Sequence, residues 1–236
     1  MKAKSILLLM FGAACMLTAK ADRFSTLAGK WTYRLDSLSV GEPQQWFTQR
    51  FSDPIALPGT TDDAGIGNTR PIFRSILGSQ PFDDYPKDAD FGMMTRRHKY
   101  IGRVWYQKEF TVSPKEAGFY RLHLERVMWL SKVWLDGQPT GKADDVLSSP
   151  HLHELGYLQP GKHVLTILVD NSEIYPIGKL AHSYCPHMQT QWNGIIGDIS
   201  LERSANAFID RLQVIPSYKE ARIRVQTVVT LSLIHI

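Results

Sequence analysis

Short runs of alternating apolar and polar residues, each bounded by turn residues, constrain the fold of this chain most strongly. Residues 104–112 and 120–125 put large apolar side chains on alternate positions, as expected for half-buried strands. The run 164–169 is apolar at five of six positions, which is typical of a strand covered on both faces. No long helical periodicity occurs after the first 21 residues. These patterns predict an all-β fold.

Turn residues separate the predicted strands. Asp136–Gly137 is a two-residue hairpin turn that tolerates positive φ at both positions, and Pro160–Gly161 precedes the run 164–169. Short β-branched and aromatic runs with this punctuation predict a β-sandwich. The stretch 57–97 is rich in Gly, Pro, Asp and Thr but also carries large apolar side chains. We therefore expect it to form an ordered excursion over one end of the sandwich.

The first 21 residues are organised like an export signal. Two lysines precede an apolar run at residues 6–17, and residues 19–21 form a small-x-small cleavage site. We therefore expect an exported protein, periplasmic or extracellular, that loses residues 1–21. A lipoprotein anchored through Cys15 is the alternative, which Gly12 disfavours.

The formal net charge of +4 comes mainly from this signal. It holds three of the 27 basic residues and none of the 23 acidic ones, so the remainder has 24 basic and 23 acidic residues. This balance gives no support for a nucleic acid or an anionic membrane surface as a partner. Only Cys185 remains after the signal, so we expect no intrachain disulfide and a fold held by its core. We expect no cofactor.

Three phrases occur in an order and spacing that resemble one known family. They are GRVWYQKE at residues 102–109, LQPGKHVLTILVDN at 158–171 and QWNGIIGDISLE at 191–202. Together they are similar to the N-terminal sugar-binding domain of glycoside hydrolase family 2, the β-galactosidase and β-glucuronidase family. The resemblance implies a jelly-roll β-sandwich similar to galactose-binding domains.

The same resemblance suggests how the chain is divided. Residues 22–204 would form the sugar-binding jelly roll, and residues 205–230, with the phrase FIDRLQVIPS, would begin an immunoglobulin-like β-sandwich. Residues 231–236 can be encoded by a string that matches a transposon end used in sequencing libraries. We therefore expect an adaptor artefact there and a reading frame that continues past Thr230; a genuine apolar tail is the alternative.

The resemblance also implies a function. The chain would be the front of a β-galactosidase-like glycoside hydrolase, with carbohydrate and the missing immunoglobulin-like and barrel domains as its partners. Retaining glycosidases need two carboxyl groups about 5–5.5 Å apart, and the family carries both on its barrel. We therefore expect no catalytic residue here and no activity from this fragment alone. The alternatives are a stand-alone carbohydrate-binding or adhesion module and a purely structural sandwich.

Two stretches are candidates for sugar contact, because in such enzymes this domain can lend residues to the mouth of the active site. The first is LPGTTDDAG at residues 57–65, which is similar to a stretch in many family members. Asp62 and Asp63 could each accept two hydrogen bonds from a vicinal diol. The structural alternative is that both residues only form a turn.

The second stretch is HMQTQWNG at residues 187–194. Gln189 and Asn193 could supply hydrogen bonds, and Trp192 could offer a flat apolar face to a pyranose ring. The structural alternative places Trp192 in the core and Asn193–Gly194 in a tight turn.

Metal-ligating residue types occur in two further places, residues 151–154 and 182–187. Neither supplies four ligands at a recognised spacing, so the sequence predicts no metal site. The acidic pairs Asp83–Asp84 and Asp144–Asp145 lie in loop sequence, where we expect solvated turns.

Overall fold

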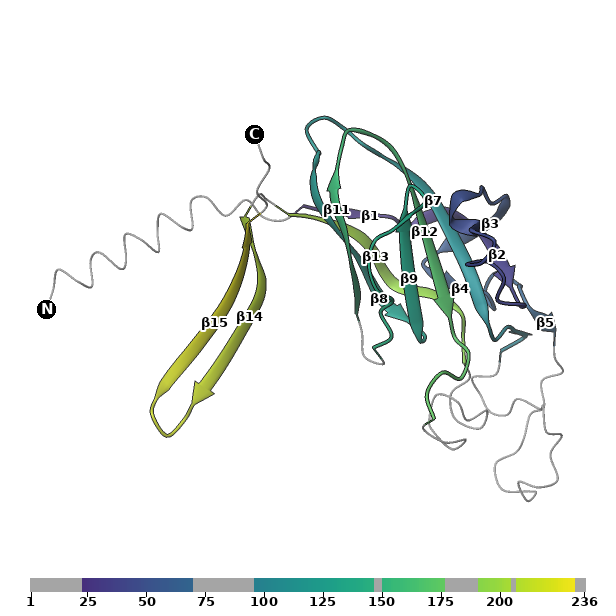
Figure 1. The fold of residues 1–236 in the computed structure, drawn as a ribbon. Coiled ribbons are helices and arrows are strands. Elements are labelled where there is room, and N and C mark those ends of the chain that lie inside the picture. The colour runs from purple at the N-terminus through teal and green to yellow at the C-terminus, as the bar shows by residue number, and fades with distance from the viewer. Residues whose placement is uncertain (1–22, 70–95, 147–149, 177–190, 205–206, 232–236) are drawn as a thin grey trace, which may run out of the picture.

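The computed structural model describes residues 23–69, 96–146, 150–176, 191–204 and 207–231. Within these ranges the regular elements are β-strands and one short 3-10 helix, η1 (Trp46–Thr48) (Figure 1). The predicted export signal, Gln189, Cys185 and nearly all of the predicted adaptor tail lie outside the described residues. No helix among the described residues is long and apolar enough to cross a membrane.

Two antiparallel sheets form the main body. The first consists, in order, of β1 (Arg23–Thr26), β13 (Gly194–Ser204), β8 (Gly118–Val127) and β11 (His151–Leu158), with β4 (Gly59–Thr60) beside β13. The second consists, in order, of β10 (Gln138–Pro139), β9 (Leu130–Leu135), β12 (Gly161–Asp170), β7 (Arg103–Val112), β2 (Gly29–Asp36) and β3 (Asp53–Leu57). The predicted all-β sandwich is confirmed.

The core between the two sheets comes from the alternation seen in the sequence. Val104, Tyr106 and Val112 of β7 are buried in one cluster with Leu122 and Leu124 of β8. Residues 165–170 of β12 are all buried, because this strand lies inside its sheet and both of its faces are covered. Each fully buried aliphatic side chain of this kind contributes about 1.5–3 kcal/mol.

A second core, which the alternation did not predict, lies on the outer face of the second sheet. Trp105 points away from the main core and packs there with Trp134 and Leu168. Residues 37–51 fold over them, and the Phe47 ring stacks on Trp134 with centroids 5.2 Å apart and planes 4° apart. Trp105 and Gln107, which lie on the outward face of β7, are both buried.

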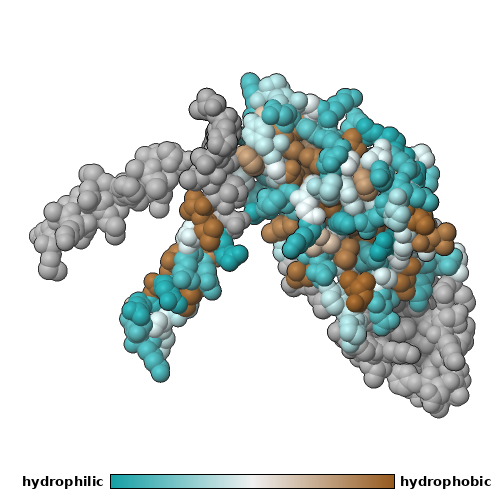
Figure 2. All heavy atoms as spheres, viewed as in Figure 1, coloured by the Kyte–Doolittle hydropathy of each residue, from teal (hydrophilic) through white to brown (hydrophobic). Residues whose placement is uncertain are grey.

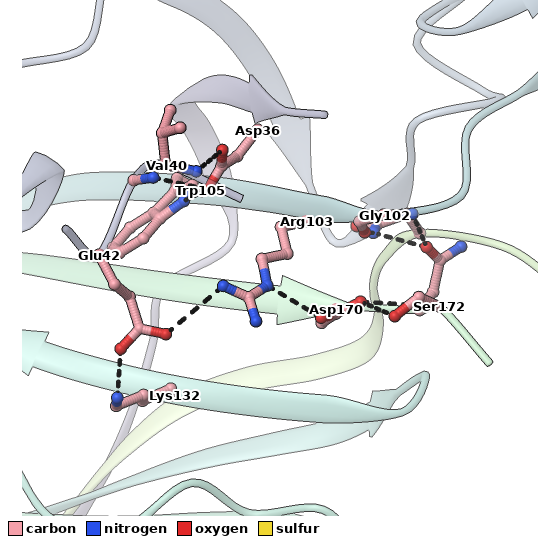
Figure 3. A network of polar contacts seen from close by, with 12 residues as sticks. Asp36, Val40, Glu42, Gly102, Arg103, Trp105, Lys132, Asp170 and Ser172 are labelled. Carbon is pink, nitrogen blue, oxygen red and sulfur yellow. Dashed lines mark hydrogen bonds and ion pairs between the residues drawn. The ribbon is translucent and has the colours of Figure 1, made fainter. Parts of the chain in front are cut away.

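Polar contacts tie this covering segment to the sheet (Figure 3). The Asp36 carboxylate accepts hydrogen bonds from the Trp105 indole at 3.0 Å and from the Val40 amide at 2.8 Å. Glu42, on the covering segment, forms ion pairs with both Lys132 and Arg103. These contacts cross from a loop to three strands and fix the cover without regular secondary structure.

The hairpin turn predicted at Asp136–Gly137 is present, with φ of 51° and 78°. Asp136 also binds His163 at the start of β12: its Oδ2 lies 2.7 Å from Nδ1, and the Gln159 carbonyl lies 2.9 Å from Nε2. Both partners are acceptors, so the geometry suits an imidazolium that donates from both nitrogens. Partial burial lowers the pKa of His163, but these hydrogen bonds and the Asp136 charge outweigh burial and raise it above 6.5.

The contact between Asp136 and His163 makes the free energy of unfolding depend on pH, with a known sign. The His163 pKa is raised in the folded state, so its contribution is fully present below about pH 6.5 and is lost as pH rises through the folded pKa. Because Asp136 is partly exposed, we expect a loss of only roughly 0.5–1 kcal/mol. Urea unfolding at about pH 6 and about pH 8.5 measures it. His163→Gln should reduce the difference in the free energy of unfolding between the two pH values. An equal difference in the unaltered protein and in this variant would contradict the assignment.

A separate two-stranded hairpin, β14 (Ala207–Ser217) with β15 (Arg222–Leu231), follows the sandwich. The two strands are joined by a turn at residues 218–221, and Pro216 and Ser217 remain paired in β14. Cross-strand partners such as Val214 and Val225 put apolar side chains on one exposed face, visible as brown spheres in Figure 2. Two strands alone are marginally stable, and the immunoglobulin-like assignment and the predicted domain division stay predictions.

Candidate functional site

The two stretches predicted to contact sugar meet at one end of the sandwich. Thr60 of β4 pairs with Gly194 of β13, and the Thr61 amide donates to the Asn193 carbonyl at 2.8 Å. Thr61 and Asn193 are 132 positions apart in the chain. Of the predicted excursion 57–97, the described parts at both ends are ordered and lie at this same end. They include β5 (Asn68–Thr69), which pairs with β6 (His98–Lys99).

Asp62 holds the backbone that returns from the excursion. Its Oδ1 accepts the amide of Arg97 at 3.1 Å and the amide of His98 at 2.7 Å. These two bonds fix the start of β6 against the 60–63 turn and do not use Oδ2. Asp62 is therefore a turn-forming residue, and within the described part of the chain its Oδ2 takes no part in these bonds.

The contacts of Asp63 are those of a turn-forming residue, which is the structural alternative given above for this position. Its Oδ2 accepts hydrogen bonds from the Thr60 hydroxyl at 2.8 Å and the Thr60 amide at 3.3 Å, while Thr60 Oγ1 accepts from the Asp63 amide at 3.1 Å. This reciprocal pattern resembles a capping box closed on a turn. Asp63 is exposed, but the turn already uses one of its oxygens.

Asn193 is fully buried and its amide is used by the protein. Its Oδ1 accepts from the Tyr106 hydroxyl at 2.9 Å, and its Nδ2 donates to the Gly102 carbonyl at 2.9 Å and to Asn171 Oδ1 at 3.2 Å. Both Nδ2 protons are thus assigned. Its position supports the loops of this end from beneath, which favours a structural role over direct sugar contact.

Asn171 is a partner in this network whose side-chain role sequence reasoning did not identify. It directly follows β12, accepts the Gly102 amide at 2.9 Å and donates to the Tyr100 carbonyl at 3.1 Å. Burial raises the pKa of the Tyr106 hydroxyl well above 10, so it stays a proton donor to Asn193 at every relevant pH. The sequence feature that could have indicated this role is an Asn that follows an apolar strand.

Three other side chains complete this end. Trp192 and Gln191 are partly buried, and Gln191 Nε2 donates to the Asn171 carbonyl at 3.1 Å. His98 is partly buried, and the described part of the chain offers its buried Nδ1 no hydrogen-bond partner. Arg96, two positions earlier, is buried. No sequence motif singled out Arg96 or His98.

The metal-ligating residue types and the acidic pairs named in the sequence analysis lie in different environments. Residues 182–187 and Asp83–Asp84 lie outside the described residues. Glu154 forms an ion pair with Arg121 at 2.6 Å. The prediction of a purely solvated Asp144 is wrong: its carboxylate accepts two backbone amides, and it lies with His151 and His153 in the only group of three metal-ligating types within the described ranges.

Comparison with known proteins agrees with the geometry of the fold. Residues 24–203 match a family model described as "Glycosyl hydrolases family 2, sugar binding domain". A β-glucuronidase from Ruminococcus gnavus, solved with C6-substituted uronic isofagomine, has a TM-score of 0.61 and 14% sequence identity, with 90% of this chain and 35% of that chain covered.

A second similar structure is a β-glucuronidase from an uncultured Clostridium sp. Its TM-score is 0.56 at 16% identity, with 89% of this chain and 34% of that chain covered. At such identities both likenesses show a shared fold, and this chain spans about a third of the length of those proteins.

Proposed function

Because the chain belongs to glycosyl hydrolase family 2 through the sugar-binding domain of that family, we propose that it is the sugar-binding portion of an exported glycoside hydrolase. The whole protein would hydrolyse O-glycosidic bonds with a catalytic barrel outside the present residues, and this portion alone would be inactive. Its partners would be carbohydrate and the remaining domains of the same chain.

The observation that carries the proposal is the meeting of residues 57–65 with residues 191–194 at one end of the sandwich. Both stretches came from the family resemblance, and the structure builds them into one surface. Beneath this surface lies the fully bonded Asn193, so the side chains above it are supported by a buried and rigid layer.

Within this surface we assign sugar contact to Trp192 and the Oδ2 oxygen of Asp62, and we keep Gln189 as a candidate. Trp192 is partly exposed and can stack on a pyranose ring. The Asp62 Oδ2 atom supplies a polar group that is not used by the hydrogen bonds that build the turn.

The test is Trp192→Ala in the protein encoded by the full reading frame. Loss of one stacking face should raise KM about tenfold and change kcat much less. Trp46→Ala is the matched control, because Trp46 is also partly buried but lies on the cover of the second sheet. Equal effects of the two substitutions would show that Trp192 has no special contact with substrate.

Two kinds of sugar are candidates for the substrate. The family resemblance suggests a β-galactoside, whereas the two similar solved structures are β-glucuronidases. Arg97 is exposed at the candidate site, and its guanidinium would suit a carboxylated sugar. Chromogenic β-galactoside and β-glucuronide, compared by kcat/KM with the same enzyme preparation, decide between them.

A stand-alone carbohydrate-binding module is the second candidate function. It is favoured by an aromatic pair on the outer face of the first sheet, where Tyr157 is 38% exposed and meets Phe119 edge-on with centroids 5.2 Å apart. Oligosaccharide binding by this chain that is lost in Tyr157→Ala and kept in Trp192→Ala would support the module instead.

A further inference from the structure

Two histidines of one sheet converge on a serine of the other. Ser131 lies on β9, whereas His151 and His153 lie two positions apart on β11 and so point to the same face. Ser131 Oγ is 2.7 Å from His151 Nδ1 and 2.8 Å from His153 Nε2. Ser131 is fully buried, and the histidines are 1% and 5% exposed. Their nitrogens are thus directed at one small region between the sheets.

Asp144 brings a carboxylate to the same place. Its backbone forms two hydrogen bonds with Ser131, at 2.8 and 2.9 Å, outside the regular strands. The Val146 amide donates to Oδ1 and the Leu152 amide to Oδ2, each at 3.2 Å, so the carboxylate is held in place. One donor atom from each of Asp144, His151 and His153 lies within 4.8 Å of the other two.

These separations suit a four-coordinate ion after a small movement. Bonds of 2.0–2.2 Å in a tetrahedron put neighbouring ligand atoms about 3.4 Å apart. The Ser131 hydroxyl lies 2.7 and 2.8 Å from the two imidazole nitrogens, so a cation that meets both lone pairs would displace this oxygen from its present position. This oxygen can serve as a fourth ligand or turn away to admit water.

The outer contacts of His151 are at Nε2, which lies 3.0 Å from the Val146 carbonyl and 3.9 Å from Asp144 Oδ1. The Val146 carbonyl, 3.0 Å from Nε2, can only accept a hydrogen bond, so Nε2 carries the proton and Nδ1 presents its lone pair. Metal-ligating histidines commonly donate their second N–H to such a carbonyl. The second imidazole is that of His153, whose Nε2 faces the same Ser131 oxygen. Ligation through its Nε2 requires its single proton to sit on Nδ1.

We propose that Asp144, His151 and His153 bind one zinc ion that joins the two sheets of the sandwich, with Ser131 at the fourth position. Two imidazoles favour zinc over calcium or magnesium, which prefer oxygen ligands. Motif spacing could not show this site, because the third ligand is Asp144 from the preceding loop, while Glu154 pairs with Arg121. The role is structural, since both histidines and Ser131 are buried and Asp144 is partly buried.

The first experiment uses the full 236-residue chain after chelator treatment and dialysis. Zinc at about 100 times its Kd should raise Tm by about 5–10 °C, and chelator should reverse the shift. One equivalent of Co2+ should give the visible absorption of a tetrahedral site. Absence of both the shift and the absorption in the unaltered chain would overturn the proposal, and this outcome does not depend on any variant folding.

The second experiment locates the ion. His153→Asn and Asp144→Asn should each weaken zinc binding by more than tenfold, because each removes or neutralises a ligand. His123→Asn, on the neighbouring strand β8 and outside the cluster, is the matched control and should keep the full shift. A zinc-induced shift that survives in His153→Asn would place the ion elsewhere in the chain and overturn the site.

Discussion

We expect Asn193→Ala to lower the free energy of unfolding by about 3–4 kcal/mol. The substitution leaves the buried Tyr106 hydroxyl without its acceptor and leaves the Gly102 carbonyl only the Asn171 amide, 3.4 Å away, as a donor; each such loss at a buried polar group costs about 1–3 kcal/mol. It also removes the contact with Asn171, which holds the neighbouring loop. The measurement is the urea midpoint followed by tryptophan fluorescence.

Asn68→Ala is the control for this prediction. Asn68 has the same side chain and lies at the same end of the sandwich, but it is exposed in β5. Substitutions of this kind usually change stability by less than about 0.5 kcal/mol. Equal midpoints for Asn193→Ala and Asn68→Ala would mean that the buried amide does not organise this end of the fold.

We expect Gly194→Ala to be comparably damaging, for a steric reason. A Cβ at this position would lie 2.2 Å from the Gly59 carbonyl oxygen and 2.8 Å from the Thr60 Cα, both backbone atoms of β4. β4 must therefore move away from β13. We expect a loss of about 3–5 kcal/mol, because backbone strain of 1–3 kcal/mol adds to the broken contact. The measurement is again the urea midpoint.

Gly161→Ala separates the clash from the strain. Its φ of +146° nearly equals the +143° of Gly194, but a Cβ there meets nothing within 4 Å. Both variants therefore carry the same backbone penalty, and only Gly194→Ala pushes the two candidate stretches apart. Sugar affinity should fall in Gly194→Ala and stay unchanged in Gly161→Ala. Identical losses of stability would contradict the close approach of β4 and β13.

Much of the fold could be predicted from local sequence, because a half-buried strand repeats every two residues. The inner faces of β7 and β8 follow that rule. The Asp136–Gly137 turn was predictable from its two residues alone. The second core could not be predicted from this alternation, because alternation assigns Trp105 to the solvent side. Its cover, residues 37–51, contains only one short 3-10 helix and is held by individual contacts such as that of Asp36 with the indole.

The candidate site was less predictable, for reasons visible at single residues. The local Thr60–Asp63 pairing was foreseeable as the turn alternative, because it spans three positions. The meeting of Thr61 with Asn193 spans 132 positions and depends on sheet topology that spacing does not encode. Whether Asn193 faces sugar or core depends on Tyr106 and Gly102, which come from β7 and the residue before it.

The most direct test of the account is a long sequencing read of the source DNA across the codon for Thr230. The account predicts a reading frame that continues through an immunoglobulin-like domain into a barrel with two catalytic glutamates. A frame that ends with Ile236 in untreated source DNA would contradict the glycoside hydrolase proposal, and the chain would then be studied as a carbohydrate-binding module.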